Sequence, residues 1–203
     1  MAIEFPQIDP VALTLGPVQI RWYALAYLAG ILLGLTYIKR ILLRENDPLC
    51  HPTRNDVDDF MNWAIIGIIL GGRVGYCLFY NASFYLENPT HIIRVWEGGM
   101  SFHGGFLGVV VSTILFSLKR KIDMLRVADL LACAAPIGLF FGRLSNFING
   151  ELYGRTTDVS WGVIFPHAGG LPRHPSQLYE ATLEGIALFL ILFMCSRIQK
   201  VKE

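Results

Sequence analysis

The sequence predicts an all-α membrane protein, a polytopic bundle of about five transmembrane helices with a small external cap. Two observations carry this prediction. Hydrophobic residues make up 53% of the 203-residue chain and charged residues only 16%, whereas soluble domains usually carry about 25% charged residues. The charges also leave long stretches uncharged, among them 22–38, 98–118 and 185–196. A buried helix of a soluble core explains the shortest stretch but not all three.

Five segments approach the length of about 20 apolar residues that a bilayer requires. They are residues 21–39, 60–80, 101–118, 127–147 and 178–196. No internal repeat or linker divides the chain, so we expect a single membrane domain over 1–203, within which 148–177 form the external cap.

Basic residues gather in alternate connections between these segments. Eleven lie in the first connection, the third connection and the C-terminal tail: Lys39, Arg40, Arg44, Arg54, Lys119, Arg120, Lys121, Arg126, Arg197, Lys200 and Lys202. By the positive-inside bias, the N-terminus is predicted outside and the C-terminus in the cytoplasm. The loops 81–100 and 148–177 then face outward.

Several functional classes find no support in the sequence. A net charge of +1 without a basic arm gives no indication of nucleic-acid binding. The four cysteines lie far apart and form no C-x-x-C pair, so we predict no disulfide framework and no metal site. Serine-hydrolase, zinc-protease and P-loop motifs are absent, and no cofactor is predicted. Residues 1–10 lack the basic region of a signal peptide, so the first span is expected to act as the insertion signal.

The second span combines a small-residue stripe with an arginine. Gly67, Gly71 and Gly75 recur every four residues, which is typical of closely packed membrane helices. Arg73 falls in the predicted outer half of the bilayer. It could extend to the interface, but its depth favours a polar cavity.

Two further candidates lie at the predicted outer ends of spans. Tyr23 follows Arg21 and Trp22 at the start of the first span, where interfacial anchoring is the simpler explanation from the residues alone. His103 opens the third span between two pairs of glycines. A lone interfacial histidine is commonly only polar, but the open surroundings and the shared leaflet make His103 a candidate for proton exchange near neutral pH.

The most informative stretch runs from Gly142 to Arg155. It follows the apolar run 130–141, where an arginine is costly and therefore needs a reason. Arg143, Asn146 and Asn149 are spaced three apart, so one helix face could hold an anion with a guanidinium and two amides.

Two acids in the last span offer a partner for such an arginine. Glu180 and Glu184 lie four residues apart near its predicted outer end and could pair with an intramembrane arginine. An ordinary preference for acids at helix starts explains them almost as well. Topology places these acids in the same leaflet as Arg73, His103 and Arg143. The residues alone therefore indicate a membrane protein that acts on an anionic lipid headgroup.

The chain resembles the bacterial prolipoprotein diacylglyceryl transferases. The family pattern G-R-x-x-N-F-x-N-x-E-x-x-G is present without a departure from Gly142 to Gly154. Similar blocks are Arg21-Trp22-Tyr23, Gly72-Arg73-Val74-Gly75-Tyr76, the run Trp96–Gly105 and the run His174–Glu180. These blocks follow the family order over nearly the whole chain.

The resemblance implies a transferase of the bacterial inner membrane that begins lipoprotein maturation. Its partners would be membrane lipids and a preprolipoprotein, and no cofactor is implied. The diacylglyceryl group of phosphatidylglycerol would move to the thiol of the lipobox cysteine, forming a thioether and releasing glycerol phosphate.

By the same resemblance, residues of this chain acquire expected roles. Arg143 and Asn146 would bind the phosphate and headgroup. Arg73 is expected to be a further lipid ligand because its predicted depth places a second guanidinium at the headgroup. Glu151 and Gly154 would shape the signature turn. Tyr23 and His103 occupy positions tied to activity, and we hypothesise that His103 is the base or a proton relay.

One departure concerns length. Family members usually continue past the H-P-S-Q-L-Y-E helix into at least one more membrane segment with a further functional arginine. We therefore expect this chain either to be active or to be a shortened, inactive form that binds lipid or a partner helix. The remaining alternative, a transporter of an anionic lipid or solute, would predict polar residues through the whole bilayer depth.

Overall fold

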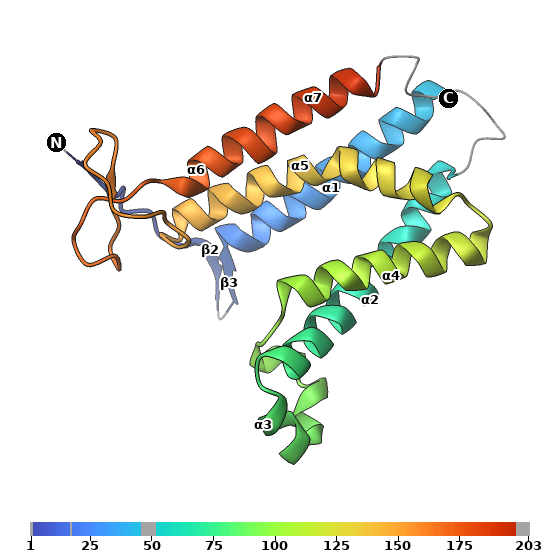
Figure 1. Ribbon diagram of the computed structural model, residues 1–203, viewed down its shortest axis with the longest axis horizontal. Coiled ribbons are helices and arrows are strands. Elements are labelled where there is room, and N and C mark those ends of the chain that lie inside the picture. Colours follow the sequence, from blue (N-terminus) through green and yellow to red (C-terminus); the bar gives the residue numbers. More distant parts are fainter. Residues whose placement is uncertain (1, 17, 46–51, 198–203) are drawn as a thin grey trace. The chain divides into compact units, whose positions relative to one another are not determined.

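The computed structural model describes residues 2–16, 18–45 and 52–197 (Figure 1). Its long helices are α1 (Trp22–Glu45), α2 (Arg54–Phe79), α4 (Phe102–Arg120) and α5 (Met124–Ile148). The last long helix is continuous from α6 (Ser176–Glu180) through a π-helical segment, η3 (Ala181–Ala187), to α7 (Leu188–Cys195). Short elements complete the chain: α3 (Ala82–Glu87), η1 (Pro89–Ile93), η2 (Val95–Glu97), β1 (Ile3–Glu4), β2 (Val11–Leu15), β3 (Val18–Arg21) and β4 (Val163–Ile164).

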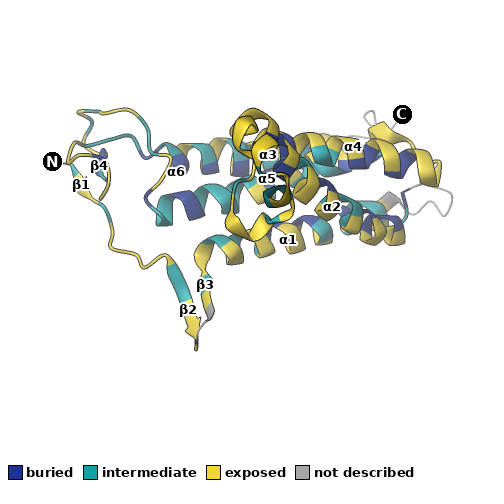
Figure 2. Ribbon diagram, turned by 90° about the horizontal axis from the view of Figure 1, so that it is seen from below, coloured by how far each residue is buried: buried dark blue, intermediate teal, exposed yellow. Residues whose placement is uncertain are grey.

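The prediction of a mainly helical protein with five spans is confirmed. Five helices of the described chain are long and apolar enough to cross a membrane. The helix boundaries differ from those of the predicted apolar segments, because polar residues extend some helices beyond the apolar stretch. For example, α2 begins at Arg54 because the Thr53 hydroxyl accepts from the Asp56 amide and the Asp56 carboxylate accepts from the Thr53 amide. Many large apolar side chains on these helices are exposed, as suits a surface that faces lipid (Figure 2).

The chain forms two compact units, residues 39–130 on the one hand and residues 1–38 with 131–203 on the other. The first unit is organised by the contact between α2 and α4. A Cβ on Gly75 would lie 2.8 Å from the Cα of Gly104, so the two backbones nearly touch. The predicted glycine stripe is therefore a helix contact, and the Ser112 hydroxyl strengthens it by donating to the Trp63 carbonyl at 2.8 Å.

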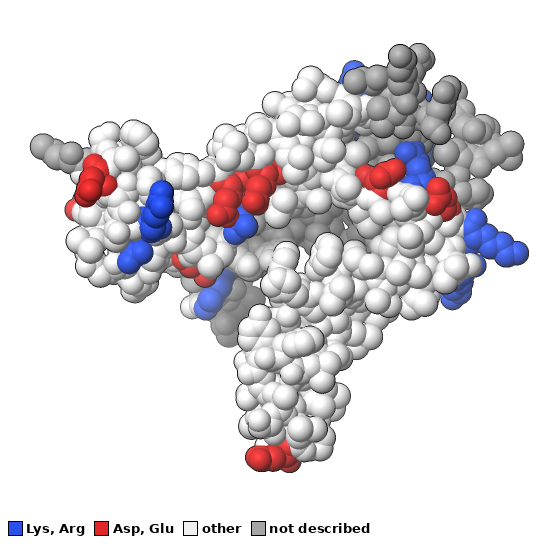
Figure 3. Space-filling view, in the orientation of Figure 1, with Lys and Arg blue, Asp and Glu red and all other residues white. Residues whose placement is uncertain are grey.

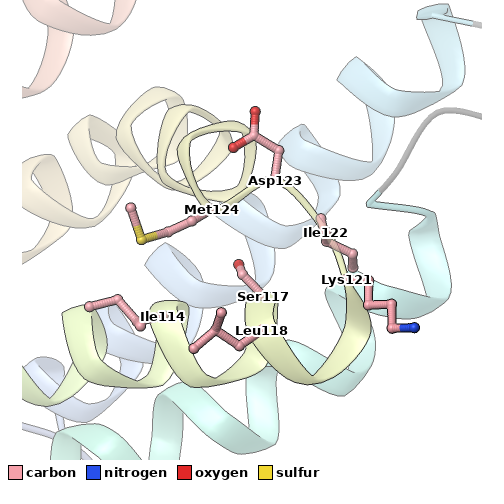
Figure 4. Close-up of a pocket in the computed structure, with 7 residues that line it drawn as sticks. All are labelled: Ile114, Ser117, Leu118, Lys121, Ile122, Asp123 and Met124. Atoms are coloured by element: carbon pink, nitrogen blue, oxygen red, sulfur yellow. The ribbon is translucent and has the colours of Figure 1, made fainter.

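Charged residues and a hollow lie at the end of α4 away from His103. Arg120 pairs there with Asp59 and, at 3.8 Å, with Asp56. The end of α4 and the turn into α5 form an open pocket of about 460 Å³ that is mostly apolar (Figure 4). It is lined by Ile114, Ser117, Leu118, Lys121, Ile122, Asp123 and Met124. This pocket includes none of the predicted site residues.

The second unit joins three helices to a small folded cap. A Cβ on Gly30 of α1 would lie 3.1 Å from the Cα of Gly138 on α5, and one on Gly185 would lie 2.8 Å from Phe140 Cβ. These close approaches pack α1, α5 and the last helix side by side (Figure 1).

The cap has a hydrophobic core and uses the N-terminal segment, neither of which the sequence indicated. Strand β1 pairs in parallel with β4, with Ile3 opposite Val163 (Figure 2). The Phe5 ring packs on Phe165, which is 1% exposed, with 5.3 Å between ring centroids. Strands β2 and β3 form a separate hairpin immediately before α1.

Replacing Gly108 by alanine is expected to lower the unfolding temperature, because the new methyl group would overlap the main-chain carbonyl of Gly67. Overpacking of this kind costs about 1–3 kcal/mol. The matched control is Gly138→Ala, since a Cβ there meets nothing within 4 Å and alanine is favoured over glycine in helices by about 1 kcal/mol. Thermal unfolding of the detergent-solubilised protein measures both. Equal unfolding temperatures for the two variants would contradict the tight α2–α4 contact.

Candidate functional site

The signature stretch ends helix α5 in a defined turn. The Glu151 amide donates to the Asn146 carbonyl at 3.0 Å, and the Gly150 amide donates to the Phe147 carbonyl at 2.9 Å. Gly150 takes the left-handed conformation, with φ 65°. These are the two bonds and the glycine of a Schellman motif. The glycine of the signature is thus explained by the way the helix stops.

The same turn folds the Glu151 carboxylate back onto the helix. Its Oε1 accepts from Asn146 Nδ2 at 2.9 Å and from Asn149 Nδ2 at 3.3 Å. The two amides expected to hold an anion therefore bind a carboxylate of this chain. Asn146 is 7% exposed, so its amide is fixed in orientation.

Arg143 faces the last helix. Its Nε lies 2.8 Å from Glu180 Oε2, and its Nη2 lies 3.6 Å from Glu184 Oε2. The prediction that these two acids pair with an arginine is confirmed, and the arginine is Arg143. On the face drawn in Figure 3, acidic and basic side chains likewise adjoin in small groups on a largely uncharged surface.

The ion pairs leave part of the Arg143 guanidinium available. An arginine has five N–H donors in a planar fork. The carboxylates engage Nε and Nη2, and no acceptor in the described part of the chain bonds Nη1. The carboxylates hold one edge of the fork, and the other can bind a further anion.

A clamp from the start of α6 holds the strained residue of the signature. Leu152 has φ 56°, a conformation that is uncommon for residues other than glycine. The Ser176 hydroxyl donates to the Leu152 carbonyl at 2.9 Å, and Gln177 Nε2 donates to the Glu151 carbonyl at 2.5 Å. Gln177 is fully buried. The H-P-S-Q run therefore fixes the turn that carries Glu151.

Gly154 is the point where the cap touches this turn. A Cβ there would lie 3.0 Å from both the Cβ and the carbonyl oxygen of His174. The Gly154 amide donates to that carbonyl at 2.9 Å, and Arg173 Nη1 donates to the Gly154 carbonyl at 3.3 Å. A side chain at position 154 would press against His174, so glycine suits this contact.

Tyr23 belongs to the same group. Its hydroxyl lies 3.1 Å from the Tyr27 hydroxyl, with the two rings edge to face. Electrostatic interactions connect Tyr23 with Glu151 and Arg143. The second unit thus brings together Tyr23, Arg143, Asn146, Glu151 and Gly154, all of them predicted site residues.

Sequence reasoning singled out neither Ser176 nor Gln177 as site residues, although both stand in the H-P-S-Q-L-Y-E run. It also missed the network in which Trp161 Nε1 donates to the Tyr179 hydroxyl at 2.8 Å and that hydroxyl lies 3.1 Å from His174 Nδ1. The Tyr179 and His174 side chains occur in the same run. Trp161 carried no signal, because its contact depends on how the cap folds.

The other two predicted site residues, Arg73 and His103, lie in the unit of residues 39–130. Arg73 is buried, and main-chain carbonyls accept all the hydrogen bonds that it donates. Its expected role as a lipid ligand stays a prediction. His103 is exposed in the first turn of α4, with its ring edge-on to Phe102.

A small ion-pair group closes the loop before α4. Glu97 accepts from Arg94 Nη1 at 3.1 Å and lies 3.0 Å from His91 Nδ1. These bonds, from Arg94 first and His91 second, hold the pKa of the Glu97 carboxyl below its ordinary value.

Leu152→Val is expected to lower the stability of the cap by about 1 kcal/mol or more, because a β-branched residue is a poor occupant of the left-handed region. Leu152→Asn should keep or raise stability, since asparagine tolerates that conformation. The control is Leu171→Val, because Leu171 is similarly exposed and is outside the residues with positive φ. Thermal unfolding compares the three, and a Leu152→Val variant as stable as its control would refute the strain.

Comparison with known proteins gives one consistent result. The family model of prolipoprotein diacylglyceryl transferase matches residues 10–203. The phosphatidylglycerol–prolipoprotein diacylglyceryl transferase of Paramagnetospirillum magneticum is 55% identical over 203 residues, covering 100% of this chain and 74% of that protein. The enzyme of the same name from Azospirillum brasilense is 57% identical over 204 residues, covering 100% and 75%. That from Rhodospirillum rubrum is 56% identical over 192 residues, covering 94% and 69%. The chain belongs to the prolipoprotein diacylglyceryl transferase family.

Proposed function

We propose that this protein transfers the diacylglyceryl group of phosphatidylglycerol to the lipobox cysteine of a preprolipoprotein. The observation that carries the proposal is the arrangement of Arg143. Two carboxylates hold one edge of its guanidinium, and Nη1 remains for an anion beside the complete signature turn. The names of the relatives support the choice of lipid and acceptor.

The reaction would be a displacement at carbon. The cysteine sulfur attacks the glycerol carbon that carries the phosphate, a C–S bond forms, and the C–O bond to the phosphate breaks. The electron pair of that bond leaves with glycerol phosphate. The thiol must first lose its proton, because the thiolate is the nucleophile.

Arg143 would stabilise the leaving phosphate. Negative charge on the bridging oxygen grows as the C–O bond breaks, so a guanidinium that binds this state more tightly than the substrate lowers the barrier. Glu180 would orient Arg143 through its short contact to Nε. The longer contact from Glu184 is the weaker of the two and holds the same edge of the fork, so that Nη1 stays available for the phosphate.

Asn146 would bind the headgroup with the help of Glu151. The Glu151 carboxylate accepts one N–H of the Asn146 amide and so fixes the direction of the rest of that amide. A fixed amide can both donate to and accept from the hydroxyl groups of a glycerol headgroup. Gly154 would keep the turn closed against the cap.

His103 would take the thiol proton or relay it, with Tyr23 as a second polar group of the reaction. Histidine suits this step because its ordinary pKa lies near neutral pH. The reaction would take place in the inner membrane, with the N-terminus and the cap of residues 148–177 outside and the C-terminus in the cytoplasm. The charge bias of the loops supports this orientation.

Arg143→Lys is expected to lower the rate of transfer by about 10²-fold, because a point charge cannot bond two carboxylates and a phosphate with a planar fork. A transfer assay with labelled phosphatidylglycerol and a lipobox peptide measures it. Arg197→Lys is the control, since Arg197 stacks on Phe193 at the far end of the last helix. Near-normal turnover of Arg143→Lys would show that transfer does not need the planar guanidinium of Arg143.

His103→Gln is expected to lower kcat by about 10²-fold or more, the usual contribution of a positioned acid or base. The same assay is run beside His167→Gln, because His167 is an exposed cap residue whose main-chain carbonyl makes its contact to Tyr153. Unchanged transfer by His103→Gln would exclude His103 as the base.

A further inference from the structure

Arg73 is the most completely bonded charged side chain in the described part of the chain. It is 3% exposed. All of its acceptors are main-chain carbonyl oxygens. Nε donates to Ile92 at 2.8 Å, and Nη2 donates to His91 at 2.5 Å and to Arg94 at 3.1 Å. Nη1 donates to Gly99 at 3.1 Å and also to Gly98. These five bonds match the five N–H groups of a guanidinium. Arg73 therefore has no donor left for a phosphate in this arrangement.

All five acceptors belong to one short segment, residues 91–99, directly before α4. The segment is built of short helical turns, in which the carbonyls of His91 and Arg94 also accept the amides of Arg94 and Glu97. Gly98 and Gly99 both have positive φ, 84° and 79°, so the chain bends sharply toward α2 there. A Cβ on Gly99 would lie 2.6 Å from the Tyr76 ring and 3.1 Å from Arg73 Nη1. The segment is shaped to wrap the guanidinium.

The residue next to Arg73 fixes the point where this segment becomes α4. The Ser101 amide donates to the Gly72 carbonyl at 2.9 Å. The Ser101 hydroxyl in turn accepts from the Gly104 amide at 3.2 Å and so caps the helix. His103 lies between Ser101, which caps the helix, and Gly104, whose amide bonds the Ser101 hydroxyl. Gly72 and Arg73 of α2 thus hold both the loop and the turn that carries His103.

We infer that Arg73 is a positioning residue, which organises residues 91–99 and through them the first turn of α4 with His103. The inference rests on the proposed function, in which His103 takes part in proton transfer. It replaces the expectation that Arg73 is a ligand of the lipid phosphate. The Tyr85 ring, 5.2 Å from the guanidinium carbon, supports the same role by covering the cation.

Arginine is required here for its number of donors. A lysine offers three N–H groups, so at least two of the five carbonyls would lose their donor. Methionine keeps the length of the side chain and donates to none of them. Arg94→Ala is the matched control, because it removes a cation from the same segment and leaves the carbonyl that Arg73 binds.

The experiment compares Arg73→Lys, Arg73→Met and Arg94→Ala with the parent protein by hydrogen exchange and by steady-state kinetics. Exchange follows the amides of Arg94, Glu97, Gly98 and Ser101, which are bonded within this region. We expect these amides to exchange about tenfold faster or more in Arg73→Met and by a smaller factor in Arg73→Lys. In the transfer assay, kcat should fall by about tenfold or more, in the same order, while KM for phosphatidylglycerol changes by less than about threefold. Arg94→Ala removes only an exposed ion pair to Glu97, so these amides should exchange less than about threefold faster than in the parent, and kcat and KM should keep their parental values.

Two results would overturn the inference. A rise of about tenfold or more in KM for phosphatidylglycerol with kcat retained would make Arg73 a lipid ligand. Exchange at the parental rate in both Arg73 variants would show that the guanidinium does not organise the segment, whether or not the parent transfers lipid. If the parent does not transfer lipid but the variants exchange faster, the proposed function is wrong, while the role of Arg73 in organising residues 91–99 stands. If Arg73→Met does not fold, Arg73→Lys provides the same comparison.

Discussion

An arginine in an apolar helix must find its acceptors within the protein, and this constraint organises both units. Arg73 and Arg143 meet it in different ways. Arg73 is enclosed by main-chain carbonyls, whereas Arg143 contacts two carboxylates at one edge of its fork. Main-chain carbonyls use all the donors of Arg73, whereas the two carboxylates leave one edge of the Arg143 fork open to an anion. The two arginines therefore suit two tasks, holding a structure and exchanging an anion.

The long helices and the cap show two ways of packing. Where helices are surrounded by lipid, apolar surface gains little by association, so close approach must supply the stability. Gly67, Gly75 and Gly104 provide it between α2 and α4. In the cap, Phe5 and Phe165 build an ordinary aromatic core, because burial from water is favourable there. Glycines thus stabilise the contacts between helices, and phenylalanines stabilise the cap.

Much of this architecture could be predicted from the sequence because its signals are local. Apolar length predicts the five spans, and the four-residue spacing of Glu180 and Glu184 indicates a shared face toward an arginine. The signature residues could be named through the resemblance. Their geometry could not, since the Asn146–Glu151 bond depends on a left-handed Gly150 that closes the turn.

Other features leave no pattern in the sequence. The acceptors of Arg73 are main-chain carbonyls, which every residue carries, so no residue type announces them. Strands β1 and β4 are two residues long, too short for alternation to be visible. The clamp from Ser176 and Gln177 bonds carbonyls too, and its target turn lies 24 to 26 positions away in the chain.

The pairing of β1 with β4 has a consequence for the order in which the protein can be made. Ile3 lies opposite Val163, and α1, α2, α4 and α5 all come between them in the sequence. At a synthesis rate of about 5–20 residues per second, the N-terminal strand waits roughly ten seconds or longer for its partner to be made. The helices can form during that time from local contacts, whereas this strand pair cannot. The cap, and with it the contact that seats Gly154, can therefore be completed only after α1, α2, α4 and α5 have been made.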